Sequence, residues 1–230
     1  MFKTVCSRMS RTKQFVGVLT VCVICSLPAP AQNASHLPQP DDDGWYSLFN
    51  GKDLMGWKAS ENYGTFRVVD GEIVIRGPRS HLFYVGPVNA ADFTNFQWKC
   101  DVLMKPHSNS GMYIHTTFQE EGWPSQGYEV QLNNTHPDPR KTGGLYAIED
   151  VMDESPVEDD QWFTQEVTVD GNHIVVRVNG TATTDYTEPE NVERPTEMAG
   201  RRLSHGTIAL QGHDPESEVH IRNIMIRPNP

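Results

Sequence analysis

Residues 96–104 read FQWKCDVLM, and the apolar residues fall on every second position. The even-numbered positions from Phe96 to Met104 are all apolar, whereas Gln97, Lys99 and Asp101 are polar. Successive side chains of a β-strand point to opposite faces, so a period of two indicates a strand with one face buried in a core and one facing outward. The stretch therefore predicts a strand of a layered β protein.

The same kind of pattern recurs on both sides of this strand. Two hairpins are predicted, in TFRVVDGEIVIRG (65–77) with a turn at Asp70–Gly71 and in FTQEVTVDGNHIVVRVNG (163–180) with a turn at Asp170–Gly171. Further short strands are predicted in GMYIHTTF, YEVQLNN, GLYAI, GTIALQGH and EVHIRNIMIRP. In the last of these the apolar phase slips after Ile221, which predicts a bulge near Arg222 and Asn223.

Helical periodicity is not convincing over more than a turn or two anywhere in the sequence. The segment 189–204 is interrupted by prolines and is expected to be a loop with one helical turn, and the acidic segment around 149–160 is expected to be a loop. Short strands joined by turns predict an all-β fold, a two-sheet jelly-roll sandwich of the concanavalin A-like lectin/glucanase type. Since no repeat of 20 to 50 residues is present, a propeller or solenoid is disfavoured.

The amino-terminal segment has the features of an export signal. Four basic residues precede an uncharged run from Phe15 to Leu27, and APA at 29–31 fits a signal-peptidase site. The apolar run is shorter than the roughly 20 residues that span a bilayer, which disfavours a membrane anchor. We therefore expect a signal peptide at 1–31, a flexible leader at 32–43, a single β-sandwich domain at 44–228, and a secreted or periplasmic protein without a membrane span after signal removal.

Charge and cysteine content narrow the function further. Removal of 1–31 would take four of the 19 basic residues and none of the 30 acidic ones, which leaves a net charge of −15. Such a surface repels phosphate backbones, so no nucleic-acid partner is expected. Three of the four cysteines lie in the segment to be removed, so Cys100 would have no intramolecular disulfide partner.

Several of the predicted central strands carry directional hydrogen-bonding side chains on the face opposite their apolar residues. In GYEVQLNN (127–134) the apolar positions oppose a carboxylate flanked by amides. Ordinary exposed strands are rich in Lys, Glu and Thr, whereas here His, Gln, Asn and Tyr predominate, and these residues bind hydroxyl groups directionally. If the strands are neighbours, they present a ligand-binding face that comprises Tyr113, His115, Glu129, Gln131, Asn133, Tyr146, Gln211, His213 and Arg222.

Other site motifs are weak or missing in the sequence. The acidic segment lacks the spaced Asp and Gly pattern of a calcium loop, and no two of the nine histidines have a zinc-site spacing. There is no Gly-rich phosphate loop and no Gly-x-Ser-x-Gly elbow. Nucleotide-binding and serine-hydrolase functions are therefore disfavoured.

Six stretches in order give the chain a family resemblance: WYSLFNGKDLMGW, SNSGMYIH, QGYEVQLNN, TGGLYAIEDV, VTVDGNHIVVRVNG and GTIALQGHDPESEVHIRNIMIRP. Together they run from about Gly44 to Arg227, and they resemble the 3-keto-disaccharide hydrolase domain family, which is abundant among secreted bacterial proteins. The resemblance implies a concanavalin-like jelly roll that acts on 3-keto sugars. A ketone at carbon 3 acidifies the proton on carbon 2, so a base removes that proton, the glycosidic oxygen leaves carbon 1, and water adds back.

The resemblance also implies roles for individual residues. Glu129 matches the family's Tyr-Glu-Val-Gln glutamate and is the first candidate for a catalytic carboxylate. His213 is expected to act as an acid or as a metal ligand, and Arg222 to hold the oxyanion. His115 is the fourth catalytic candidate. Sugar-binding roles are expected for Gln131, Asn109, Tyr146, Trp57, Tyr113 and Asn133.

Three positions depart from the family pattern. His115 stands where arginine is common, Asn133 where aspartate often follows the strand, and Gly212 where an acid is common. These exchanges replace a fixed cation by a titratable group and remove acidic groups. They are compatible with a changed substrate, altered metal use or lost activity.

The resulting hypothesis is an exported hydrolase or lyase that cleaves 3-keto glycosides and works with a sugar 3-oxidoreductase. The sequence establishes no cofactor, and participation of a divalent cation is left open. The alternative is a non-catalytic carbohydrate-binding module in which Trp57, Trp123 and Tyr146 stack on sugar. A third hypothesis is that the protein is a structural domain of the cell envelope that binds no ligand.

Overall fold

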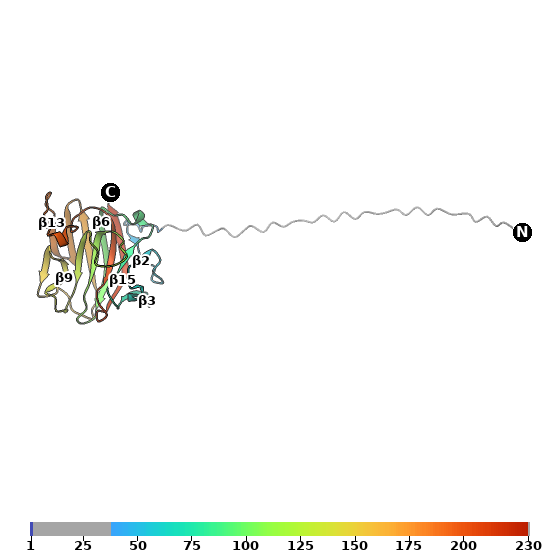
Figure 1. Cartoon of the computed structure of the whole chain (residues 1–230), viewed down its shortest axis with the longest axis horizontal. Helices are drawn as coiled ribbons and strands as arrows, with labels where there is room; N and C mark the ends of the chain where they lie inside the picture. Colours follow the sequence, from blue (N-terminus) through green and yellow to red (C-terminus); the bar gives the residue numbers. More distant parts are fainter. Residues whose placement is uncertain (2–37, 230) are drawn as a thin grey trace. The chain divides into compact units, whose positions relative to one another are not determined.

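The computed structural model of the protein describes Met1 and residues 38–229. Over 38–229 the chain forms two antiparallel β-sheets that pack face to face (Figure 1). This arrangement confirms the predicted two-sheet sandwich. The predicted signal segment, apart from Met1, and residues 32–37 of the predicted leader lie outside the described residues.

The larger sheet has eight strands in the order β13-β12-β11-β6-β15-β4-β3, with β1 paired to β15. Residues 96–104 belong to the central strand of this sheet, β6. The strands are β1 (Tyr46–Ser47), β3 (Phe66–Val69), β4 (Glu72–Ile75), β6 (Asn95–Met104), β11 (Phe163–Asp170), β12 (His173–Val178), β13 (Thr181–Thr187) and β15 (Val219–Asn229).

The smaller sheet has seven strands in the order β10-β9-β8-β7-β14-β5-β2. They are β2 (Trp57–Ala59), β5 (Ser80–Tyr84), β7 (Ser110–Thr116), β8 (Tyr128–Leu132), β9 (Arg140–Leu145), β10 (Glu149–Met152) and β14 (Thr207–Gly212). Three short 3-10 helices lie between strands: η1 (Tyr63–Thr65), η2 (Val88–Ala91) and η3 (Thr196–Met198). The strand β10 corrects the expectation that the whole acidic segment is a loop, and η3 is the helical turn expected within 189–204.

The core lies between the two sheets. Trp98 and Val102 of β6 are fully buried there, as are Met112 of β7, Val130 of β8 and Leu210 of β14. Each of the large side chains stabilises the fold by about 1.5–3 kcal/mol relative to an exposed position. Because the apolar face of each smaller-sheet strand is used up in this core, its polar face must lie on the other side of that sheet.

The register of the smaller sheet places those polar faces side by side. Tyr113 of β7 lies opposite Glu129 of β8, and Gln211 of β14 lies opposite His81 of β5. The strand β14 also pairs with β7 on its other edge. The outer face of β7, β8 and β14 therefore brings polar side chains together, as predicted, and beside them Phe83 and Ala209 form a small apolar cluster with the Tyr113 ring.

The two hairpin turns and the bulge lie at, or within one residue of, their predicted positions. Asp70 and Gly71 both have positive φ between the paired residues Val69 and Glu72, which confirms the first turn. In the second hairpin Asp170 still pairs with His173, so the turn consists of 171–172, one residue later than expected. The bulge in β15 is confirmed by the register shift that follows Arg222.

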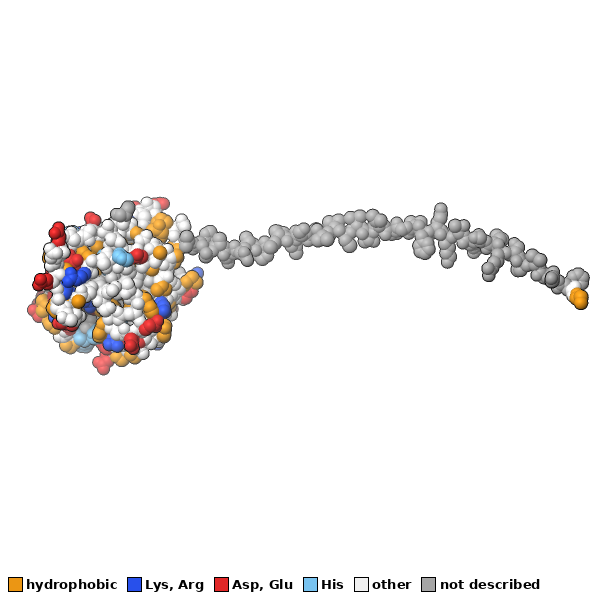
Figure 2. Space-filling model, turned by 45° about the horizontal axis from the view of Figure 1, so that its top comes forward, with side chains coloured by type: hydrophobic (Ala, Val, Ile, Leu, Met, Phe, Trp, Pro, Cys, Tyr) orange, Lys and Arg blue, Asp and Glu red, His pale blue; other side chains and the backbone are white. Residues whose placement is uncertain are grey.

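The surface of the domain matches the acidic composition. The face in Figure 2 carries acidic side chains in several places, while Lys and Arg form only small groups. Among the described residues, no helix has the length and apolarity required to cross a membrane.

Candidate functional site

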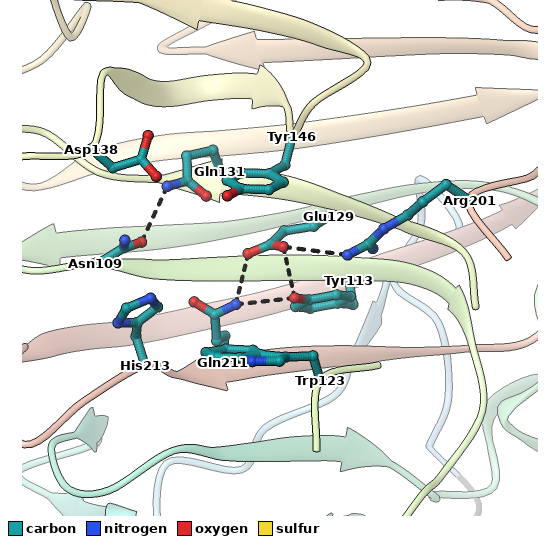
Figure 3. Close-up of a pocket in the computed structure, with 10 residues that line it drawn as sticks. All are labelled: Asn109, Tyr113, Trp123, Glu129, Gln131, Asp138, Tyr146, Arg201, Gln211 and His213. Carbon is teal, nitrogen blue, oxygen red and sulfur yellow. Dashed lines mark hydrogen bonds and ion pairs between the residues drawn. The ribbon is translucent and has the colours of Figure 1, made fainter. Parts of the chain in front are cut away.

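A pocket of about 270 Å³ opens on the polar face of the smaller sheet (Figure 3). Its floor is made by strands β7, β8 and β14, and its rim by the loops around 123, 138, 146 and 201. The residues that line it are Asn109, Tyr113, Trp123, Glu129, Gln131, Asp138, Tyr146, Arg201, Gln211 and His213. Six of the ten catalytic and sugar-binding residues predicted from the sequence are thus brought together: Asn109, Tyr113, Glu129, Gln131, Tyr146 and His213.

Glu129 lies on the pocket floor and is only 6% exposed. The Tyr113 hydroxyl donates a hydrogen bond to Oε2 at 2.7 Å, and Gln211 Nε2 donates one to Oε1 at 2.6 Å. Burial raises the pKa of Glu129, although the hydrogen bond from Tyr113 and the charge of Arg201 work in the opposite direction. A buried carboxylate with a raised pKa and an opening to a pocket is suited to proton transfer.

Arg201 supplies the cation next to this carboxylate. Its Nη2 lies 3.7 Å from Glu129 Oε2, and its guanidinium stands 5.4 Å from the centre of the Tyr113 ring. The loop that carries it is held against β8, since the Gly127 amide donates to the carbonyl of Gly200 at 2.9 Å. Sequence reasoning missed Arg201 because it treated 189–204 as a connecting loop; the available signal was an Arg-Arg pair in an acidic chain.

A second polar cluster lies beside Glu129 on the same floor. Gln131 Nε2 donates to Asn109 Oδ1 at 3.1 Å, and Asn109 Nδ2 lies 3.5 Å from His136 Nδ1. The side-chain oxygens of Gln131 and Gln211 are buried without a hydrogen-bond partner among the described residues. Since buried acceptors are normally paired, these two oxygens suit the hydroxyl donors of a sugar.

His213 is oriented by its neighbour Asp214. His213 Nδ1 lies 2.7 Å from Asp214 Oδ2, and Asp214 also accepts a hydrogen bond from the Ser217 hydroxyl at 2.9 Å. Burial alone would raise the pKa of Asp214, but the hydrogen bonds from His213, Ser217 and the backbone outweigh it and hold that pKa below its usual value. An ionised Asp214 fixes the proton on Nδ1, so Nε2 is the ring nitrogen that can exchange a proton with a ligand.

Aromatic side chains form the walls of the pocket. Trp123 is 43% exposed at the rim, and its ring lies 5.3 Å from His213 and 5.5 Å from His81. Tyr146 lies on the opposite side of the pocket in Figure 3. Exposed aromatic rings facing a polar floor are typical of carbohydrate sites, because sugar C–H faces stack on them.

His81 lies beneath this wall and was not among the predicted site residues. It is fully buried, both ring nitrogens lack a hydrogen-bond partner among the described residues, and its ring stands edge-on to Tyr113 at 5.3 Å. Burial lowers the pKa of His81 to about 3, so the ring is neutral at physiological pH. The sequence signal, a histidine in SHLFY, was missed because 80–84 was not identified as a strand.

Two predicted catalytic residues lie away from the pocket. His115 has a φ of 53° next to a register irregularity between β7 and β14, and its ring turns out of the polar face. His115 Nε2 donates to the carbonyl of Thr94 at 2.9 Å, and its ring packs 5.7 Å from that of Phe96. Arg222 belongs to β15 of the other sheet, where its guanidinium lies 3.9 Å from the Trp162 ring centre. The expectation that both residues share the polar face is wrong.

Two predicted sugar-binding residues have structural environments instead. Trp57 is buried in the core, with Nε1 donating to the carbonyl of Leu48 at 2.7 Å. Asn133 is fully buried and its Nδ2 donates to the carbonyls of Asp138 and Arg140, which shapes the loop at the rim. Neither lines the pocket.

Gly212 also has a structural explanation. A Cβ at this position would lie 2.4 Å from Thr65 Cγ2, so a side chain there would point away from the pocket. Within residues 38–229, no group of three or more His, Cys, Asp or Glu side chains is placed to hold a metal ion.

Three bacterial proteins of known structure share this architecture. A provisionally named glycosyl hydrolase from Parabacteroides distasonis superimposes with a TM-score of 0.69 at 25% identity, over 82% of this chain and 95% of that chain. A second protein from that organism, named in the same way, gives a TM-score of 0.58 at 23% identity, over 80% and 99% of the two chains. A galectin-like protein of unknown function from Bacillus subtilis gives 0.56 at 10% identity, over 80% and 94% of the two chains, and shows the fold alone.

No curated protein sequence matches the chain significantly. The profile of one family, described as the 3-keto-alpha-glucoside-1,2-lyase-like domain, matches residues 44–227. Together with the first of these structures, the provisionally named glycosyl hydrolase at 25% identity, this match supports a carbohydrate-active β-sandwich. The chain belongs to the 3-keto-alpha-glucoside-1,2-lyase-like domain family.

Proposed function

We propose that the protein is an exported enzyme that cleaves 3-keto glycosides by elimination across carbons 1 and 2, followed by hydration. The observation that carries this proposal is the buried Glu129 carboxylate with Arg201 beside it and the His213–Asp214 pair in the same pocket. These groups supply a base, a cation and an acid. An ordinary glycosidase would instead require two carboxylates on either side of the scissile bond.

The reaction needs no external oxidant once the substrate carries its ketone. A base takes the proton from carbon 2, and the electron pair of that C–H bond moves toward carbon 3 as an enolate. The enolate then forms a double bond between carbons 1 and 2, the C1–O bond breaks, and the leaving oxygen takes a proton. Water adds back across the double bond, with its oxygen on carbon 1 and its proton on carbon 2.

Glu129 serves as the base in this scheme. One of its oxygens accepts a hydrogen bond from Tyr113 and the other accepts one from Gln211. Because each carboxylate oxygen has two lone-pair sites, one site on each oxygen remains for the substrate proton. Burial and the charge of Glu129 raise the pKa of Tyr113 well above its usual value, so Tyr113 stays a neutral donor. When Glu129 takes up the proton, its ion pair with Arg201 is lost, and the guanidinium is free to bind the enolate oxygen.

His213 serves as the acid that protonates the leaving oxygen. The carboxylate of Asp214 holds Nδ1, so the proton is delivered from Nε2. In the hydration step the same nitrogen takes a proton from water. Gln131 and Asn109 bind the hydroxyl groups of the sugar, and Tyr146 covers it from the opposite wall.

The proposed substrate implies that the protein acts together with a sugar 3-oxidoreductase. The acidity of the carbon 2 proton depends on a ketone at carbon 3, and glucosides do not carry one until an oxidoreductase creates it. Export to the periplasm or the medium follows from the predicted signal segment 1–31. A protein secreted without residues 1–31 is the expected product, and mass spectrometry of the mature amino terminus tests this.

The experiment compares matched substrates and variants. Purified protein is incubated with an α-glucoside and with the same glucoside oxidised at carbon 3, and release of the aglycone is measured. We expect turnover of the 3-keto compound only, a loss of at least 100-fold in Glu129→Gln, and no change in Glu120→Gln, a glutamate whose side chain is 77% exposed. Equal inertness of wild type and Glu129→Gln on several 3-keto glycosides would contradict the proposal.

The exposed ring of Trp123 also favours a second candidate, a carbohydrate-binding module. In that case the protein would bind glycosides without cleaving them, affinity would survive Glu129→Gln, and it would fall in Trp123→Ala. Binding without turnover of any 3-keto glycoside would select this candidate.

A further inference from the structure

A second cleft, of about 590 Å³, adjoins the pocket on the side of His213. It is lined by His107, His136, Pro137, Asp214, Pro215 and Glu216. The His136 ring lies 5.8 Å from the His213 ring, and Asn109 of the pocket floor contacts His136 Nδ1 at 3.5 Å. The cleft and the pocket are therefore neighbours, and the rings of His136 and His213 lie between them.

The His213–Asp214 pair stands at the boundary between the two spaces. His213 lines the pocket, whereas its hydrogen-bond partner Asp214 lines the cleft. In the proposed reaction the acid must contact the glycosidic oxygen, which is the atom that joins the reacting sugar to its leaving group. With the carbon 2 proton directed at Glu129 and the glycosidic oxygen at His213, we expect the leaving group to extend past His213 toward the cleft.

The walls of the cleft are flat and largely uncharged on two sides. Pro137 and Pro215 present aliphatic ring faces, and His107 and His136 present imidazole rings. Burial lowers the pKa of His136, so this ring is neutral at physiological pH. Ring faces of this kind stack on planar or pyranose rings.

Carboxylates set the charge of the cleft. Asp214 and Glu216 line it, whereas Asp138 of the adjoining pocket is paired with Arg140, whose Nη1 lies 3.6 Å from Asp138 Oδ1. Lys141 is only 7% exposed, and its ammonium donates to the carbonyl of His136 at 2.8 Å. The residues that line the cleft therefore include two carboxylates and no Lys or Arg, which leaves a negative field that repels an anionic ligand.

We propose that this cleft is the leaving-group subsite, and that it accepts a neutral ring while it discriminates against a carboxylated one. The inference rests on the proposed function for the order of sugar and leaving group. Its charge selectivity, however, depends only on the cleft itself, so it is also measurable as binding.

The test uses two nearly isosteric aglycones that differ in charge. 4-Carbamoylphenyl α-glucoside and 4-carboxyphenyl α-glucoside are prepared in their ordinary and 3-oxidised forms. We expect kcat/KM for the 3-oxidised carbamoylphenyl compound to exceed that for the carboxyphenyl compound at least fivefold at low salt. In Glu216→Gln this ratio should fall about threefold, and it should also shrink as salt rises, because exposed charges are screened. Asp170→Asn, an exposed carboxylate of the other sheet, is the matched control and leaves the ratio unchanged.

The two proposals fail in distinguishable ways. If no 3-keto glycoside is cleaved, the proposed function fails, and the subsite is then decided by calorimetric Kd values of the ordinary glucosides, for which the same ratio and the same effect of Glu216→Gln are expected. Equal kcat/KM or Kd values for the two aglycones overturn the subsite. A ratio that is insensitive to both Glu216→Gln and salt overturns it as well.

Discussion

Gly111 lies directly under the carboxylate of Glu129. A Cβ built on Gly111 would come within 2.6 Å of Glu129 Oε1 and within 3.0 Å of its Cγ. These residues are on the paired strands β7 and β8, where Gly111 lies opposite Gln131. The glycine of the SNSGMYIH stretch is thus explained by the site, because any side chain there would occupy the space of the proposed base.

Gly111→Ala should therefore displace the Glu129 carboxylate while leaving the fold intact. The atom it meets is the far end of a side chain, which can move, so we expect only a small change in the free energy of unfolding. A misplaced catalytic group of about 1 Å can cost up to about 100-fold in rate, and we expect kcat/KM to fall about 10- to 100-fold. Steady-state kinetics and urea denaturation measure the two quantities.

Gly64→Ala is the matched control, since a Cβ at Gly64 would meet nothing within 4 Å. It should leave kcat/KM unchanged. Full activity of Gly111→Ala would show that the position of the Glu129 carboxylate is not critical.

Arg201 lies in the pocket of the smaller sheet, whereas Arg222 belongs to the larger sheet, so substitution of each arginine tests which sheet carries the activity. Arg201→Gln removes the cation 3.7 Å from Glu129 Oε2 and should lower kcat/KM about 100-fold, which is typical for the loss of one group that stabilises an oxyanion. Arg222→Gln, on the other sheet, should leave kcat/KM within about twofold of wild type. A large loss in Arg222→Gln with none in Arg201→Gln would reverse the assignment made from the structure.

The fold could be predicted because its signals are local. Alternation in 96–104 and the polar face of GYEVQLNN both follow from a period of two. β6 has the alternating burial that this period predicts, whereas β8 is buried on both faces because its polar face forms the floor of the pocket. The bulge after Arg222 was predictable for the same reason, since it shows as a slip in phase.

The site was predicted only in part because its assembly is not local. Alternation tells which face of a strand is polar, but not which sheet the strand joins, and so Arg222 was assigned to a pocket that lies on the other sheet. His115 illustrates a second limit, since a single positive φ turned its ring to the opposite side. The Arg-Arg pair at 201–202 indicates a cation but does not place it, because the loop that carries Arg201 is held at the site by a hydrogen bond from the Gly127 amide to the carbonyl of Gly200.

The raised pKa of Glu129 predicts the acidic limb of the activity profile. A base must be deprotonated, so kcat/KM should fall as the pH drops through this pKa, and burial places that inflection above the ordinary value of 4.5. The Tyr113 hydrogen bond lowers the pKa, so in Tyr113→Phe the inflection should move to still higher pH. Profiles of kcat/KM from pH 4 to 9 measure both shifts, and an inflection below 4.5 in the wild type would rule out Glu129 as the titrating base.

His81 predicts how the stability of the fold depends on pH. Burial lowers its folded-state pKa from 6.5 to about 3, so between these values the unfolded chain binds a proton that the folded chain does not. The stability that His81 contributes is therefore fully present above pH 6.5 and is lost as the pH falls toward 3, by up to about 1.4 kcal/mol per pH unit. From pH 6.5 to 5 this amounts to about 2 kcal/mol.

His81→Phe keeps an aromatic ring of similar shape and cannot take up a proton. The free energy of unfolding, measured in urea at pH 7.5, 6.5, 5.5 and 5.0, should decline less steeply in this variant than in the wild type, with the difference growing toward about 2 kcal/mol at pH 5. His205→Gln, at a histidine whose side chain is 68% exposed, should retain the wild-type slope. Parallel stability curves for wild type and His81→Phe would mean that His81 is hydrated or protonated in the folded protein, and its burial beneath Trp123 would then have to be incomplete in solution.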